Sequence, residues 1–305
     1  MLDDVVSIKA EDHFCAALTQ DGSLWTWGEN CFGQLGDGTT ETVLTPKKVL
    51  DQVKTVETEQ AHMAAILQDG SLYLWGGSGL YDNDTFGEMN HICDYGPSPK
   101  QFMSGVKQVE LTCFSGAALK EDGSLWTWGH NDKGQLGDGT VNDSKDPVRI
   151  MDNVIKICMD ESCGMAIQKD YTLWTWGENE NGQLGDGTVK NRALPKKITD
   201  KAVDLAQGSG HCMMVKYDGS LWMWGYNVHG QLGNNSSKVR KAPRRIIRDA
   251  LVTVDADQVK EEIKAEKERQ KEEKQRQKEA EREARKAKKS QKPSAKPSPT
   301  TKAEE

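Results

Sequence analysis

One phrase recurs five times in the first 235 residues, and it constrains the fold more than any other feature of the chain. It reads Asp-Gly-Ser-Leu-Trp-Thr-Trp-Gly, followed after a short spacer by Gly-Gln-Leu-Gly-Asp-Gly-Thr; the copy at residues 69–76 keeps only the first half. Its second tryptophan falls, at spacings of 48, 53, 48 and 48 residues, at Trp27, Trp75, Trp128, Trp176 and Trp224. A period of this size is typical of an array of supersecondary units that bury apolar faces against one another, so we expect each of these five tryptophans to be largely buried between adjacent blades.

Each repeat predicts four short strands. A run of small apolar residues, such as residues 15–18, precedes the phrase and reads as a buried strand. The Asp-Gly that follows supplies the positive φ of a tight hairpin turn. In the next strand Trp25 and Trp27 share one face, because alternate residues point the same way. A Pro-led segment and an alternating segment complete a blade that is apolar on both faces and lies between neighbouring blades.

The combination of the small-residue strand, the Trp-Thr-Trp-Gly strand, Asn30 with its equivalents, and the Gly-Gln-Leu-Gly-Asp-Gly-Thr turn resembles the regulator of chromosome condensation repeat. The resemblance covers roughly residues 1–255 and implies an all-β fold, a β-propeller of about five four-stranded blades. Members of that family include a guanine-nucleotide exchange factor, an inhibitor of β-lactamase and proteins with no assigned partner. The fold alone does not fix an activity, because one scaffold carries many functions.

The common family ring has seven blades, so five repeats predict either a closed five-blade ring or an incomplete one. We expect a blade to run from the small-residue strand to the alternating strand, which places the last strand at residues 251–255. Residues 5–9 are then one strand too many. That strand either replaces the last one to clasp the ring or leaves an exposed edge that invites pairing with another chain.

Three segments differ in composition. Residues 1–256 form the repeat array, residues 257–289 a charged helical extension and residues 290–305 a disordered tail rich in Pro, Lys and Ser. Residues 257–305 hold 16 Lys+Arg and 12 Asp+Glu of the chain's 40 and 47, which leaves residues 1–256 with a net charge of −11. No apolar heptad persists in the helix, so we expect a solvated single helix that makes few contacts with the repeats.

The cysteines and the amino terminus indicate the compartment. Seven cysteines are scattered and odd in number, and three of them (Cys15, Cys163 and Cys212) lie in or beside small-residue strands. This pattern favours reduced thiols in a cytoplasmic protein. The first residues lack the features of a secretory signal, and no apolar run is long enough to span a membrane. We expect no membrane partner and no nucleic acid, since Glu is interleaved with Lys through the helical extension.

No residue set predicts catalysis or a cofactor. The Gly-Gln-Leu-Gly-Asp-Gly-Thr turn lacks the Lys of a phosphate loop and recurs in four blades, so a glycine-shaped turn accounts for it better. Asp37 and its equivalents offer one carboxylate each where calcium needs several oxygens, which favours a turn-capping role. The His/Cys pairs lack a partner pair at zinc spacing. His13 and His62 are interpreted as loop histidines. We therefore expect no catalytic residue, cofactor or metal ligand.

The most irregular segment is residues 76–100, where the second repeat loses half of its phrase and gains five residues. Loops on rigid scaffolds often carry binding residues, and aromatic anchors with an acidic rim suit an interface. The candidate partner-binding residues there are Leu80, Tyr81, Asp82, Asp84, Phe86 and Glu88. A degenerate repeat is the alternative. A second candidate group, in the loops after each tryptophan strand, is Glu29, His130, Glu178 and Tyr226.

Three functions remain open. The chain is predicted to be a non-enzymatic scaffold that binds an unidentified protein through one face of the propeller. The first alternative is regulation of an enzyme or small GTPase, as exchange factor or inhibitor. The second alternative is a structural role, in which an incomplete array self-associates through its open blade edge.

Overall fold

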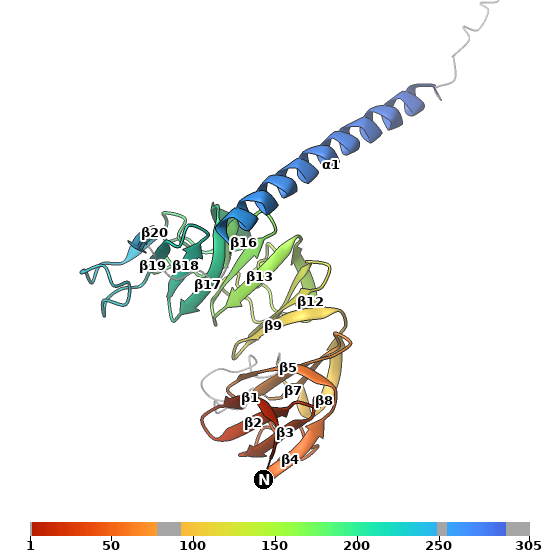
Figure 1. The fold of residues 1–305 in the computed structure, drawn as a ribbon, viewed down its shortest axis with the longest axis vertical. Coiled ribbons are helices and arrows are strands. Elements are labelled where there is room, and N and C mark those ends of the chain that lie inside the picture. Colours follow the sequence, from red (N-terminus) through yellow and green to blue (C-terminus); the bar gives the residue numbers. More distant parts are fainter. Residues whose placement is uncertain (1, 78–92, 249–254, 291–305) are drawn as a thin grey trace, which may run out of the picture.

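The computed structural model describes residues 2–77, 93–248 and 255–290. Twenty strands form five antiparallel sheets, each built of four strands consecutive in sequence, and a long helix follows them (Figure 1). The predicted all-β architecture of four-stranded blades followed by a charged helix is therefore confirmed.

The blades are numbered in chain order. Blade 1 consists of β1 (Val5–Ala10), β2 (Phe14–Thr19), β3 (Leu24–Gly28) and β4 (Val43–Leu50). Blade 2 consists of β5 (Val53–Glu59), β6 (His62–Leu67), β7 (Leu72–Gly76) and β8 (Gly96–Met103). Blade 3 consists of β9 (Val106–Leu111), β10 (Ser115–Lys120), β11 (Leu125–Gly129) and β12 (Ser144–Met151). Blade 4 consists of β13 (Val154–Met159), β14 (Cys163–Gln168), β15 (Leu173–Gly177) and β16 (Arg192–Thr199). Blade 5 consists of β17 (Ala202–Gly208), β18 (His211–Lys216), β19 (Leu221–Gly225) and β20 (Arg240–Ile247), and the helix is α1 (Ala256–Ser290).

The expected boundary between blades was wrong by one strand. β1 is the first strand of blade 1 and pairs with β2, with Ala10 opposite Cys15 across a short hairpin. Each alternating strand thus leads into the small-residue strand of its own blade, and residues 5–9 are not a surplus strand. The strand expected at residues 251–255 falls almost wholly outside the described residues.

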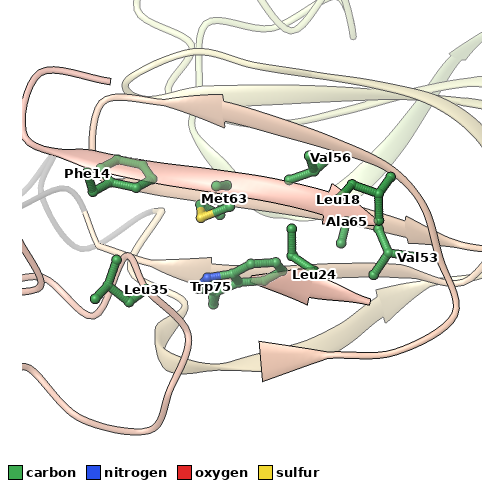
Figure 2. Packing of buried hydrophobic residues seen from close by; sticks show 10 residues of the cluster. Phe14, Leu18, Leu24, Leu35, Val53, Val56, Met63, Ala65 and Trp75 are labelled. Carbon is green, nitrogen blue, oxygen red and sulfur yellow. The ribbon is translucent and has the colours of Figure 1, made fainter. Parts of the chain in front are cut away.

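Successive blades stack face to face. The face of a blade that contacts the preceding blade is called its front face, and the face that contacts the following blade its back face. Between blades 1 and 2, Leu18, Leu24 and Leu35 of the back face pack against Val56 and Trp75 of the front face (Figure 2). Clusters of the same kind join the other neighbouring blades. Burial of these apolar side chains is what stabilises an array whose units have no core of their own.

The five blades follow an arc whose two ends lie apart, with blade 1 and blade 5 at opposite ends (Figure 1). Four of the repeated tryptophans are fully buried, as predicted: Trp75, Trp128, Trp176 and Trp224. Trp27 is only half-buried, which corrects the expectation that all five are enclosed. The reason is that Trp27 lies on the front face of blade 1, which no other blade covers in the described residues.

The base of α1 docks onto blades 4 and 5, contrary to the expected solvated helix. Val259 is 3% exposed, and the hydroxyl of Tyr171 donates a hydrogen bond to the carboxylate of Glu262. Tyr171 has φ 61°, at a turn position where the other blades carry a glycine, for example Gly22 with φ 83°. A bulky residue in this region is strained, and such strain persists only where surrounding contacts hold it.

Replacing Val259 with Ala is expected to lower the free energy of unfolding by about 1–2 kcal/mol, because two buried methyl groups are lost. Lys264→Ala, an exposed change on the same helix, is the control and should alter stability little. Urea unfolding followed by circular dichroism measures both. Equal midpoints for the two variants would show that the helix base does not stabilise the blades.

Candidate partner-binding face

The connections between strands divide the arc into two ends. The Asp-Gly turns and the short links between blades lie at one end, called the turn end. The hairpins between the first two strands of each blade and the long connections after each tryptophan strand lie at the other, called the loop end. The helix base contacts Tyr171 and Tyr217, both at the turn end, so it does not occupy the loop end.

A buried asparagine holds each of four long connections. The Oδ1 atom of Asn30 accepts a hydrogen bond from the amide of Leu35 at 2.9 Å, and its Nδ2 donates to the carbonyl of Thr39 at 3.0 Å. The bond to the leucine amide is repeated by the equivalents Asn131, Asn179 and Asn227. All four asparagines are fully buried, and buried polar groups are costly unless they are paired. These loops are therefore rigid supports.

The Asp of each Asp-Gly-Thr turn caps its own loop, as predicted. Oδ1 of Asp37 accepts from the amide of Thr39 at 3.0 Å and from its hydroxyl at 2.7 Å, and Asp186 does the same with Thr188. Burial opposes ionisation of Asp37, but hydrogen bonds from Lys47 and Thr39 outweigh it and lower its pKa to about 2. In residues 2–77, 93–248 and 255–290, no group of three His, Cys, Asp or Glu is placed to hold a metal ion.

A cavity of about 710 Å³ lies at the loop end between blades 4 and 5. Glu178 and Tyr226, two of the residues predicted from the long connections, both line it. Asp160 and Glu161, from the hairpin between β13 and β14, add two more acidic residues to the lining of this cavity. The cavity thus combines an aromatic surface with carboxylates, the composition expected of a site for a cationic group.

More carboxylates gather at the loop end along the first strands of the blades. The thiol of Cys113 donates to Glu161 at 3.2 Å and lies 3.7 Å from Glu59. Burial and the nearby charges of Glu11 and Glu161 raise the pKa of Glu59. Burial and the two neighbouring carboxylates likewise raise the pKa of Cys113. These carboxylates at the loop end therefore repel one another, and a cationic partner bound there would reduce that repulsion.

The other two candidates of the second group lie at the same end but in separate blades. His130 lies 3.0 Å from Asp132 and 3.0 Å from Asp143, while Glu29 lies 3.6 Å from His13. The structure thus brings Glu178 and Tyr226 together and leaves Glu29 and His130 to other parts of the face. The first candidate group, Leu80 to Glu88, lies outside the described residues.

Sequence reasoning missed two sets of residues. It overlooked Glu59, Asp160 and Glu161, although acidic residues recur where the first strand of a blade ends. It also missed Tyr95, whose hydroxyl accepts the indole N–H of Trp128 at 2.8 Å. In the other junctions a glutamine carbonyl accepts this bond, and the second repeat has lost the segment that would carry that glutamine. Tyr95 supplies the acceptor instead. The sequence signal that could have identified it is a tyrosine directly before the Pro-led strand of blade 2.

The repeated blades and their asparagine-held loops agree with a comparison against known families, in which the RCC1-like domain matches residues 1–261. The chain belongs to the RCC1-like domain family. This RCC1-like chain is similar to the human E3 ubiquitin-protein ligase HERC2, with 29% identity over 130 residues that cover 41% of this chain and 3% of HERC2. It is also similar to the mouse X-linked retinitis pigmentosa GTPase regulator, with 29% identity over 141 residues, or 43% of this chain and 14% of that protein. It thus spans a small part of these relatives.

Two solved structures resemble this RCC1-like fold. Human WBSCR16 aligns with a TM-score of 0.65 and 23% identity over 81% of this chain and 68% of that one. Prp20p from Saccharomyces cerevisiae aligns with a TM-score of 0.62 and 24% identity over 80% of this chain and 63% of that one. At this level of identity the likeness supports the propeller fold and does not extend to partners.

Across the described residues, no helix is long and apolar enough to cross a membrane.

Proposed function

We propose that this RCC1-like protein is a non-enzymatic scaffold that binds a basic segment of a partner protein at its loop end. The observation that carries the proposal is the cavity between blades 4 and 5, which Tyr226 lines together with Asp160, Glu161 and Glu178. Aromatic side chains with a charged rim are frequent hot spots of interfaces. The net negative charge of residues 1–256 adds long-range attraction for such a partner.

Two further observations support the proposal. The helix base occupies the turn end, so the rigid loops at the opposite end remain as the face that a partner can approach. All seven cysteines are free thiols, which supports our placing the protein in a reducing compartment such as the cytoplasm.

Combining Tyr226→Ala with Glu178→Gln is expected to weaken binding of the leading co-purifying protein roughly thirtyfold, about 2 kcal/mol, as hot-spot loss does. Titration calorimetry with the purified partner measures the affinity. Glu121→Gln, an exposed change at the turn end, is the charge-matched control and should leave the affinity unchanged. Full affinity of the double variant would exclude this cavity as the binding site.

The second candidate function is regulation of a small GTPase. It is supported by the similarity to a protein named as a GTPase regulator, although this chain matches only part of it. Release of a fluorescent guanine nucleotide from a panel of purified small GTPases tests this function directly. Acceleration that is lost in the Tyr226→Ala and Glu178→Gln double variant would make the partner a GTPase, whereas no acceleration with any member of the panel would leave the scaffold proposal in place.

A further inference from the structure

At three junctions inside the arc, one tryptophan of the following blade is inserted into the loop of the preceding blade. At three junctions the indole Nε1 donates to a glutamine carbonyl: Trp75 to Gln34 at 3.0 Å, Trp176 to Gln135 at 2.8 Å and Trp224 to Gln183 at 2.7 Å. The ring fills space that only glycine leaves open. A Cβ atom added at Gly36 would lie 2.6 Å from Nε1 of Trp75, and at Gly185 it would lie 2.8 Å from that of Trp224.

A backbone hydrogen bond completes the same junctions. The amide of Gly38 donates to the carbonyl of Pro97 at 2.9 Å, and the amide of Gly187 donates to that of Lys241 at 2.8 Å. A Cβ atom at Gly33 would lie 2.5 Å from Pro97, so the loop backbone rests directly on the last strand of the following blade. Each junction therefore needs a tryptophan and a strand on one side and a glycine-rich loop on the other.

The front face of blade 1 carries the tryptophan and the strand of such a junction, which we call its tryptophan half, but no glycine-rich loop of the described residues covers it. Trp27 is half-buried, and no hydrogen-bond acceptor for its Nε1 is found in the described part of the chain. Ile8 is 74% exposed, whereas Val56 at the equivalent position of blade 2 is 4% exposed. Leu44, which corresponds to Pro97, is 87% exposed. The position that Ile8 holds on this face is buried in every later blade.

The back face of blade 5 is the loop half without its tryptophan. A Cβ atom at Gly233, the equivalent of Gly36, would meet nothing closer than 3.9 Å. One at Gly230, the equivalent of Gly33, would meet nothing within 4 Å. Met213, Val215 and Leu221 are half-buried there, although the equivalent residues of blade 4 are fully buried: Met165, Ile167 and Leu173. Blade 5 thus keeps a glycine cradle for an indole ring that it does not hold.

We propose that the front face of blade 1 docks onto the back face of blade 5 in a second copy of this chain. Trp27 then enters the cradle at Gly233 and donates to the carbonyl of Gln231, while the carbonyl of Leu44 accepts from the amide of Asn235. The chain carries both halves of one junction, and these halves lie apart in the single molecule (Figure 1), so a second copy is the occupant that fits both.

This association uses the faces that end the arc, and its cradle in the long connection of blade 5 is separate from the residues that line the cavity between blades 4 and 5, so it goes beyond the proposed function. It also differs from pairing through an exposed strand edge, because the contacts come from side chains and loops on the blade faces. The contact is head to tail, and a head-to-tail contact leaves one unfilled half at each end of a dimer. Further copies therefore add until the assembly closes.

Two single variants and their mixture test the proposal by sedimentation velocity on the full chain over a dilution series. Ile8→Asp places a charge on the front face at a position exposed in the monomer. Gly233→Asn fills the cradle, and asparagine tolerates the φ of 59° found there. The wild type is expected to show mass that rises with concentration, and each variant alone at least about tenfold weaker association. Mixed together, they should form a one-to-one dimer, because one intact pair of faces remains.

Val141→Asp, an exposed change away from both end faces, is the control and should associate like the wild type. Thermal unfolding of each variant checks that the monomer is intact. A wild type that stays monomeric at every concentration would overturn the proposal. Self-association of the Gly233→Asn variant at wild-type strength would also overturn the proposal, because it would indicate that two front faces contact each other. A mixture of folded variants that yields no heterodimer would also overturn it.

Discussion

Trp176→Ala is expected to lower the free energy of unfolding by about 3–5 kcal/mol, the range for deleting a large buried aromatic side chain. The indole ring of Trp176 is fully buried between blades 3 and 4 and packs against Leu119, Leu125 and Ile157. Its loss also leaves the carbonyl of Gln135 without its donor. The site cannot collapse easily, because the ring lies between two glycine positions, Gly137 and Gly164, whose backbones are fixed by their strands and turns.

Trp27→Ala is the matched comparison, since it removes the same side chain from the same position of the repeat. We expect a cost of about 1 kcal/mol or less, because this ring is only half-buried and no other blade of the described structure packs on it. Guanidinium unfolding followed by circular dichroism should be run at low protein concentration, where self-association contributes least. Equal costs for the two variants would mean that the front face of blade 1 is covered.

The positions of the tryptophans were predictable from the sequence, but the different state of Trp27 was not. The repeat predicts that each blade has an apolar front face with a tryptophan that a preceding blade must cover, and this holds equally for all five blades. Whether the first blade finds a neighbour depends on closure of the array, which is a property of all the blades together. Five repeats are compatible with a closed or an open ring, so the exposure of Ile8 and Leu44 required the structure.

The first strand of each blade shows a second limit of the sequence. A period fixes the length of a unit and does not fix where the unit begins, so the sequence alone predicts a surplus strand where β1 opens blade 1.

The helix shows a third limit. A composition of Lys and Glu predicts a solvated helix, yet the burial of Val259 and the bond from Tyr171 to Glu262 come from turns distant in sequence.

The candidate site was partly predictable for a related reason. The capping role of Asp37 follows from a local turn, and local geometry is encoded within a few residues. The cavity at Glu178 and Tyr226 also needs Asp160 and Glu161 from a separate hairpin of the chain. Sequence spacing could point to the long connections as binding loops, but the acidic lining of the cavity arises only where blades 4 and 5 meet.

His62 was expected to be a loop histidine, and the structure places it in β6 instead. The side chain is 2% exposed, and its ring lies 5.9 Å from that of Tyr95 in an edge-to-face arrangement. Burial disfavours the imidazolium and lowers the pKa of His62 to about 4 from 6.5. The unfolded chain therefore binds this proton at a higher pH than the folded chain does.

Stability should accordingly be full above about pH 6.5 and fall as the pH drops toward 4, by about 3 kcal/mol from this one group. His62→Phe is expected to remove that dependence, and the chain itself shows that phenylalanine fits, since Phe14 occupies the equivalent position of blade 1 and is 4% exposed. Urea unfolding of both proteins at several pH values between these limits gives the difference directly.

Asp37 and Asp186 lose their stabilising charges only as the pH falls below about 4, because their pKa values are lowered to about 2. This loss occurs equally in the wild type and in the His62→Phe variant. Parallel pH profiles for the two proteins would therefore mean that His62 is protonated in the folded state.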